Sequence, residues 1–358
     1  MDLDRIRAYL TLNYIEHHAN VVCAPLINDG LDIEEIVSFT ALQWEEFFSK
    51  SKVNRIMQTV HQIDSQELLD RILEKKIGLL PIEDEDYPEL LKEIYNPPLL
   101  LFYLGKLPPK ESIHVAVVGS RDSSLQGRCV AEDLGQFLAR NGVSVVSGFA
   151  RGIDRAAHKG AVQCKPPGYA VGVVGVGIQD FLKPKLFDLY EKVLQNGMIV
   201  SEFPLGFPAR KQNFPLRNRI ITGMSLATVI VEASIRSGSM ISAKLALEQG
   251  REVFAIPGPI HSQTSEGTNF LIREGATLLS KFEDLFEDLN LELEEGELEG
   301  LSEQELHVLE ALSRTPMPVE ELVYSLVQPL GKVAKTLLEL EARGLVKRHP
   351  GDLVSKIH

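Results

Sequence analysis

The sequence predicts an α/β protein whose main domain is an extended Rossmann-like, doubly wound parallel sheet. Short apolar runs alternate with helical stretches between residues 113 and 289. The first unit begins with the β-branched run Ile113–Val118, continues through a helical stretch at Leu125–Arg140 and ends in a second strand at Val143–Val146. Strands that alternate with helices in this way form parallel sheets with right-handed crossovers, and such sheets bind ligands beyond the carboxyl ends of their strands.

Further strands continue the pattern. We expect them at Tyr169–Val174, Met198–Ser201, Ala227–Val231, Glu252–Ala255 and Ala276–Leu279. Residues 1–80 are expected to form a domain of short helices, in which Trp44, Phe47 and Phe48 have the spacing of core residues. The proline-rich residues 81–112 are expected to lead from this helical domain into the main domain at 113–289.

The C-terminal part differs in character. Residues 282–305 hold eleven acidic residues and no Lys or Arg, a composition typical of a solvated or disordered tether, and we place an acidic linker at 290–300. Residues 301–358 predict a winged-helix domain, because three helical stretches precede a hairpin that turns at Pro350-Gly351. The three stretches are Leu306–Ser313, Val319–Leu326 and Leu330–Arg343.

Charge is distributed unevenly along the chain. The net charge is −13, yet residues 114–280 carry 18 Lys/Arg against 13 Asp/Glu, which gives that segment +5. A locally basic segment favours contact with nucleic acid even within an acidic chain. The three cysteines are too scattered for a zinc or disulfide framework, and we expect no metal and no cofactor. The N-terminus lacks a signal-peptide pattern and no apolar run reaches membrane-spanning length, so we expect a cytoplasmic location without membrane contact.

Small and cationic residues follow several of the predicted strands. Glycine lets backbone N–H groups and helix N-termini approach an anion, and arginine adds a permanent charge. A segment at 210–219 adds four cations and one aromatic side chain. The resulting candidate residues are Gly119, Ser120, Arg121, Ser147, Gly148, Lys211, Phe214, Arg217, Arg219, Ser237, Gly238 and Ser239.

Several of these candidates have an alternative structural explanation. Arg217 and Arg219 could instead pair with Asp154 or Glu232 inside the fold, and Phe214 could be a core residue rather than a base-stacking platform. His158 is expected to be a helix residue that forms hydrogen bonds within the fold, since no nucleophile accompanies it. The turn at Gly119 is neither Gly-x-Gly-x-x-Gly nor a P-loop, which argues against a dinucleotide-binding enzyme and a P-loop ATPase.

Between residues 113 and 280 the sequence resembles the DNA-processing protein A family, also called DprA or Smf. The resemblance is carried by seven ordered motifs: Gly119-Ser-Arg, Ser147-Gly-x-Ala-Arg-Gly-Ile-Asp154-x-x-Ala-His158-x-Gly-Ala161, Ser201-Glu-x-Pro-x-Gly206, Phe214-Pro-x-Arg-Asn-Arg-Ile-Ile-x-Gly223, Val231-Glu-Ala-x-x-x-Ser-Gly-Ser239, Gly250-Arg-x-Val-Phe-Ala-x-Pro-Gly258 and Ser265-x-Gly-Thr-Asn-x-Leu-Ile-Arg-x-Gly-Ala276.

This resemblance implies a non-enzymatic mediator that binds and protects single-stranded DNA and helps to load the RecA recombinase onto it, as in natural transformation. It also implies a homodimer formed through the Rossmann-like domain, an N-terminal domain of the SAM or helix-hairpin-helix type and a C-terminal winged helix. The residues that match the family's DNA contacts are Arg121, Lys211, Phe214 and the turn Ser237-Gly-Ser239.

Two other functions are alternatives to single-stranded DNA binding. A nucleotide-hydrolysing enzyme of the phosphoribohydrolase type would use paired glycines and a nearby glutamate, whereas the corresponding turn here reads Glu232-Ala-Ser-Ile-Arg-Ser-Gly-Ser239. A duplex-binding transcription factor would use the winged helix, but residues 329–356 hold six Lys/Arg against three acids and are only mildly basic. Tight duplex binding normally needs several phosphate contacts, so this modest basicity argues against the transcription factor.

Overall fold

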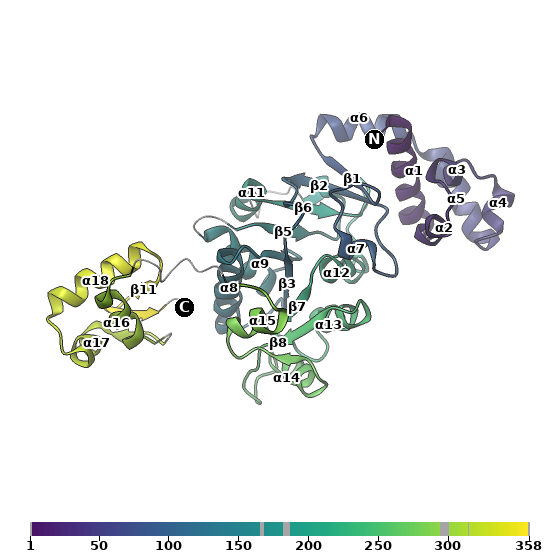
Figure 1. The fold of residues 1–358 in the computed structure, drawn as a ribbon. Coiled ribbons are helices and arrows are strands. Elements are labelled where there is room, and N and C mark those ends of the chain that lie inside the picture. The colour runs from purple at the N-terminus through teal and green to yellow at the C-terminus, as the bar shows by residue number, and fades with distance from the viewer. Residues whose placement is uncertain (1, 165–167, 182–186, 294–300, 314, 357–358) are drawn as a thin grey trace. The chain divides into compact units, whose positions relative to one another are not determined.

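A computed structural model describes residues 1–358 apart from 1, 165–167, 182–186, 294–300, 314 and 357–358. The chain divides into two compact units, Met1–Leu291 and Glu292–His358, which are described separately (Figure 1).

Within the described residues, the first unit is built on a nine-stranded sheet with the order β1-β2-β6-β5-β4-β3-β7-β8-β9. Seven of these strands run parallel to one another, which confirms the predicted parallel sheet: β3 (His114–Val118), β4 (Ser144–Ser147), β5 (Ala170–Val173), β6 (Gly197–Ser201), β7 (Ala227–Ile230), β8 (Glu252–Ala255) and β9 (Thr277–Leu278).

Two strands at one edge were not predicted. β1 (Gly78–Pro81) pairs antiparallel with β2 (Leu100–Gly105), and β2 pairs antiparallel with β6. Residues 81–112 therefore do more than link two domains, because β2 extends the sheet. The proline-rich flanks hid these strands, since proline in sequence argues for a loop although an edge strand tolerates it.

Helices cover both faces of the sheet (Figure 1). Alternate residues of β3 point to opposite faces: Val115 and Val117 belong to one core cluster, Ala116 and Val118 to the other. The first face is covered by α8 (Leu125–Arg140), α9 (Ile153–Gln163), α11 (Phe187–Gln195) and α15 (Phe282–Leu289). The second is covered by α7 (Glu89–Lys92), α12 (Asn213–Gly223), α13 (Gly238–Glu248) and α14 (Glu266–Arg273).

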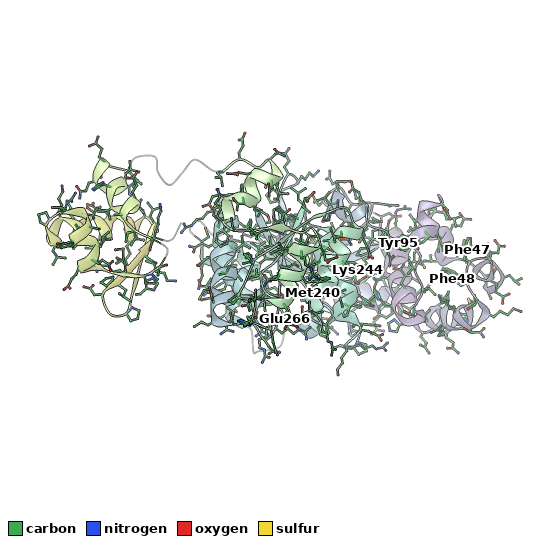
Figure 2. All side chains as sticks on the ribbon, turned by 90° about the horizontal axis from the view of Figure 1, so that it is seen from below. Phe47, Phe48, Tyr95, Met240, Lys244 and Glu266 are labelled. Atoms are coloured by element: carbon green, nitrogen blue, oxygen red, sulfur yellow. The ribbon has the colours of Figure 1, made fainter. Side chains whose placement is uncertain are left out.

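The N-terminal helices share a third core cluster with the β2 edge of the sheet, through Leu100 and Phe102. They are α1 (Leu3–Ala19), α2 (Ala24–Asn28), α3 (Ile33–Val37), α4 (Ala41–Glu45), α5 (Lys50–Gln62) and α6 (Ser65–Glu74), and α10 (Ile178–Phe181) packs with them. Trp44 is fully buried as expected, and Phe48 is half-buried. The prediction of a core position was wrong for Phe47, labelled in Figure 2, which is exposed. Its ring stacks on the buried Phe39.

The second unit has the predicted winged-helix order. α16 (Glu303–Ala311), α17 (Val319–Leu326) and α18 (Leu330–Ala342) precede the hairpin of β11 (Val346–His349) and β12 (Leu353–Lys356). A short strand β10 (Met317–Pro318) pairs with β12 and completes a three-stranded sheet. Ser302 and Glu305 form a capping box at the start of α16.

The acidic stretch was interpreted wrongly at its beginning. Residues 282–289 form helix α15 rather than a tether, and its Leu285 and Phe286 are buried in the main core. Glu287 and Asp288 of this helix are exposed while Leu285 and Phe286 are buried, so a high acid content concealed an amphipathic helix. Most of the expected linker at 290–300 lies outside the described residues.

We predict that Phe286→Ala lowers the free energy of unfolding by about 3–5 kcal/mol, since a large buried aromatic is lost and a cavity is left. The Phe286 ring is 1% exposed and meets Phe137 edge-on at 5.3 Å. Equilibrium denaturation measures the change, with Leu293→Ala as control because that side chain is exposed. Equal and small effects of both substitutions would show that residues 282–289 are not part of the folded core.

Candidate nucleic-acid interface

The turn after β3 is held in place by Glu232, which follows β7. The Ser120 N–H donates to the Glu232 carbonyl oxygen at 2.7 Å. The backbone N–H and the hydroxyl of Ser124 donate to the Glu232 carboxylate at 2.8 and 2.6 Å. Ser124 also caps α8 by accepting from the Gly127 N–H at 2.9 Å. The turn from Gly119 to Ser124 is therefore fixed at both ends, while Arg121 remains exposed.

The turn after β4 is built around a buried arginine from α12. The Arg217 guanidinium donates to the Gly148 carbonyl oxygen at 2.7 Å and to the carbonyl oxygen of Val173 at the end of β5. A Cβ at Gly148 would lie 2.2 Å from Arg217 Nη2, so only glycine leaves room for the guanidinium. Ser147 is also turned inward, since its hydroxyl donates to the Val117 carbonyl oxygen at 2.6 Å.

Asp154, at the start of α9, completes this buried polar cluster. Its carboxylate accepts from the N–H groups of Gly148 and Ala150 at 3.2 and 3.3 Å. Burial raises the pKa of Asp154, and the Arg217 charge opposes that shift. Burial likewise lowers the pKa of Arg217 to about 10, so the guanidinium stays charged at neutral pH. The Asp154 carboxylate therefore holds the backbone of the turn after β4 and lies close enough to Arg217 to feel its charge.

Arg121 and Phe214 meet across the carboxyl-end edge of the sheet. The Arg121 guanidinium carbon lies 5.2 Å from the centre of the Phe214 ring, in the geometry of a cation–π contact. Phe214 is half-buried and stands in the first turn of α12, so it is not a core residue. Gly175, after β5, lies beneath it, where a Cβ would be 3.2 Å from the ring. The result is an aromatic surface with a cation on it.

The remaining residues of α12 connect this surface to its neighbours. Arg219 donates to the Glu202 carboxylate at 2.6 and 3.1 Å. Arg219 is therefore paired inside the fold, with Glu202 rather than with Asp154 or Glu232. The Asn218 side chain reaches the Gly238 carbonyl oxygen at 3.5 Å, at the start of α13. There Ser237 is the N-cap residue, and its hydroxyl lies 2.5 Å from that of Ser239 rather than on the helix backbone.

Other cations near this edge are exposed. Arg210, Lys211 and Arg236 have exposed side chains, and none of the described acidic groups forms an ion pair with them. Arg210 lies 5.1 Å over the Phe207 ring. On the same edge Arg151 pairs with Asp122, both largely exposed. Exposed cations beside a half-buried aromatic ring and small-residue turns suit a flexible polyanion that carries planar bases.

Sequence reasoning missed three contributors to this site. Glu202 belongs to a motif that was recognised, but its role as the partner of Arg219 depends on a contact between β6 and α12. Gly175 is not among the predicted site residues, although its place directly after the predicted strand Tyr169–Val174 was a usable signal. The buried His158 ring stacks on Phe149 at 4.3 Å, a contact that the sequence did not predict. Phe149 has a φ of +55°, an unusual conformation for a non-glycine residue.

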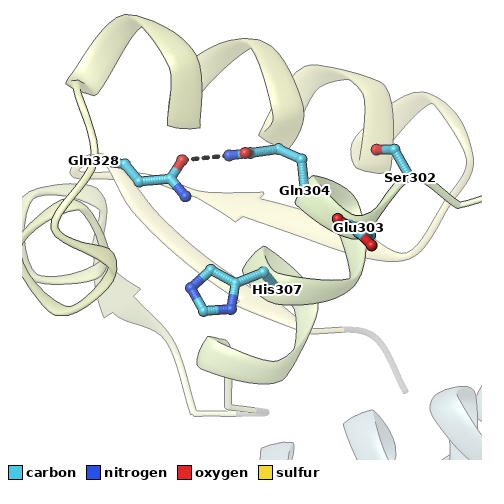
Figure 3. Close-up of a pocket in the computed structure, with 5 residues that line it drawn as sticks. All are labelled: Ser302, Glu303, Gln304, His307 and Gln328. Carbon is cyan, nitrogen blue, oxygen red and sulfur yellow. Dashed lines mark hydrogen bonds between the residues drawn. The ribbon is translucent and has the colours of Figure 1, made fainter.

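Other kinds of site have little support in the described residues. In the described part of the chain, no group of three or more His, Cys, Asp or Glu side chains could hold a metal ion, and no described helix is long and apolar enough to cross a membrane. A polar pocket in the second unit is lined by Ser302, Glu303, Gln304, His307 and Gln328, where Gln304 donates to Gln328 (Figure 3).

Comparison with known proteins places both units in one group. The family described as DNA recombination-mediator protein A matches residues 78–290, and the DprA winged helix domain matches residues 292–352. Protein Smf of Escherichia coli strain K12 is 39% identical over 288 residues, which cover 77% of this chain and 76% of that protein. DNA processing protein DprA of Bacillus subtilis is 35% identical over 263 residues, covering 69% and 88%.

Two solved structures share the fold. The X-ray structure of DNA processing protein A from Streptococcus pneumoniae has a TM-score of 0.63 at 32% identity and covers 80% of this chain and 95% of its own. A structure concerning the single-stranded DNA binding mode of DNA processing protein A from Helicobacter pylori has a TM-score of 0.53 at 28% identity, covering 60% and 96%.

We predict that Gly148→Ala lowers the free energy of unfolding by about 1–3 kcal/mol, because the added methyl displaces Arg217 from two buried carbonyl oxygens. Gly238→Ala is the matched control, since a Cβ there meets nothing within 4 Å, and it should change the free energy by less than about 0.5 kcal/mol. Chemical denaturation of both variants checks this. Equal stability of the two would mean that the close approach of Arg217 does not constrain the turn.

A second prediction concerns pH. Burial lowers the pKa of His158 to about 3, below its ordinary value of 6.5, so the unfolded chain binds the proton more readily. Stability from this residue is present above pH 6.5 and is lost as the pH falls from 6.5 towards 3, by about 1.4 kcal/mol per pH unit. His158→Phe should show a shallower loss in denaturation series over that range. Parallel pH curves for parent and variant would contradict a buried neutral His158.

Proposed function

This chain belongs to the DNA recombination-mediator protein A family, and from that premise we propose that its main domain binds single-stranded DNA along the carboxyl-end edge of the sheet. The main observation behind this proposal is the contact between Arg121 and Phe214, which places a cation on an aromatic ring at the end of β3, the first parallel strand along the chain. The relative from Helicobacter pylori, whose solved structure concerns a single-stranded DNA binding mode, supports this choice of ligand.

The proposal separates contact residues from supporting residues. Phe214 offers a face for a base, while Arg121 and Lys211 meet backbone phosphates. The Ser120 hydroxyl beside Gly119 and the turn at 237–239, where α13 begins, add polar groups to the same edge. Ser147, Gly148, Arg217 and Arg219 are already engaged inside the fold, so we assign them the role of holding those contact residues in place.

The contacts of Glu232, in the turn after β7, favour a binding role over a hydrolytic one. A hydrolase of the phosphoribohydrolase type would need a carboxylate that faces its substrate. The Glu232 carboxylate instead accepts two hydrogen bonds from Ser124, and Gly127 packs so closely that a Cβ there would lie 2.3 Å from its carboxyl carbon. We therefore propose that this protein performs no chemical step on its DNA.

The family description, a DNA recombination mediator, supports a proposal about the wider role. We propose that the chain protects single-stranded DNA in the cytoplasm and helps to load RecA onto it, as in natural transformation, and that two copies pair through the Rossmann-like domain. In this proposal residues 113–289 form the DNA-binding domain, and residues 301–358 form a separate winged helix beyond the acidic linker.

We predict that Arg121→Ala and Lys211→Ala weaken binding of a fluorescent oligothymidylate and reduce the slope of log K against log[salt] by about 0.7 each. Phe214→Ala should cost about 1–3 kcal/mol of binding free energy with the slope nearly unchanged, because it removes stacking rather than charge. Fluorescence anisotropy over a salt series measures all three.

The matched control is Lys159→Ala, which removes an exposed cation that pairs with Glu132 on the first helical face. Each variant must keep the thermal midpoint of the parent. Folded variants of Arg121, Lys211 and Phe214 that bind like the parent would place the DNA site elsewhere.

A further inference from the structure

The N-terminal helix α1 contacts the loop that leads into the proposed DNA-binding segment. The Asn13 side chain donates to the Glu202 carbonyl oxygen at 2.9 Å, and the Tyr14 hydroxyl donates to the Leu205 carbonyl oxygen at 3.0 Å. Asn13 is buried and Tyr14 is half-buried. Two backbone groups of the loop after β6 are thus satisfied by side chains from the other end of this unit's sequence.

Aromatic rings continue the same contact. The His17 ring lies 4.9 Å from Phe203 and 5.5 Å from Phe207, and those two phenylalanines stack on each other at 5.5 Å. His18 meets Phe207 edge-on at 5.3 Å and itself stacks on Tyr14. Phe203 and Phe207 are both buried, so α1 packs against the loop from Glu202 to Phe207 along its length.

Both ends of this loop are linked to residues 210–219, the segment that is proposed to bind DNA. At one end Phe207 carries the Arg210 guanidinium at 5.1 Å, next to Lys211. At the other end the Glu202 carboxylate pairs with Arg219, one turn of α12 beyond Phe214. Residues 210–219 are therefore tied to α1 at two points, through Phe207 and through Glu202. In contrast, Arg121 and Arg236 sit on turns that are held by other parts of the sheet.

We propose that α1 positions the segment Arg210–Phe214 for DNA, with Asn13, Tyr14 and His17 as positioning residues that do not themselves bind it. This inference rests on the proposed function, because it describes how one part of the DNA site is held. The N-terminal helical domain then contributes to affinity through the order of a loop rather than through contact. Loosening α1 lets Lys211 and Phe214 move, and each then pays an ordering cost on binding.

The test is a double-mutant cycle on the full chain. The positioning variant combines Asn13→Ala with Tyr14→Phe, which removes both donors to the loop and retains the Tyr14 ring. Thr11→Val is the matched control, because its hydroxyl donates only within α1, to the Arg7 carbonyl oxygen. We expect the positioning variant to weaken oligothymidylate binding by about 3- to 10-fold and the control by less than about 2-fold.

The cycle separates positioning from simple packing. Lys211→Ala should cost less in the positioning background than in the parent, because Lys211 is already misplaced there. Arg236→Ala should cost the same in both backgrounds, since its turn does not contact α1. Amide hydrogen exchange should also be faster at 203–210 in the positioning variant and unchanged at 236–239.

Several outcomes decide between the inference and its premise. A folded positioning variant that binds like the parent, or additive costs for Lys211→Ala, would overturn the inference. If the parent binds no oligothymidylate, the proposed function fails instead. If the thermal midpoint of the positioning variant falls, Tyr14→Phe alone replaces it in the same cycle, and additivity there overturns the inference equally.

Discussion

The structure depends on one buried charge at the carboxyl-end edge of the sheet. Arg217 is 4% exposed and satisfies carbonyl oxygens that follow β4 and end β5. A buried guanidinium is tolerated only when its donors are satisfied and an acid lies nearby, which Asp154 provides. These requirements fix a glycine at 148 and hold α12 across the edge. Because α12 is held there, Phe214 stands beside Arg121 rather than in the core.

The charges of this site divide into two classes by their surroundings. Arg217 and Arg219 are bound to partners inside the fold, whereas Arg121, Lys211, Arg210 and Arg236 have exposed side chains. An acidic chain can bind a polyanion when its unpaired cations gather on one edge, since salt screens acids that lie more than about 8–10 Å away. The net charge of −13 therefore says little about the ligand.

Much of this could be predicted from sequence, and the exceptions have physical causes. The parallel strands and α8 follow from hydrophobic periodicity and glycine turns, which act locally. β2 was missed because nearby prolines indicate a loop, and α15 was missed because its acids indicate a tether. The apolar residues of both elements become informative only once their distant packing partners are known. Arg121, Lys211 and Phe214 were singled out from sequence, but the contact between Arg121 and Phe214 was not, because it depends on how α12 packs against the turn after β3. The Arg219–Glu202 pair depends on tertiary packing, which no local pattern encodes.

The most direct test of the central claim is hydrogen–deuterium exchange of the full chain with and without oligothymidylate. If the carboxyl-end edge is the DNA site, amide exchange should slow at residues 119–124, 210–219 and 236–239 and stay unchanged in α16, α17 and α18. Slowing confined to residues 301–358, or to the N-terminal helices, would contradict it.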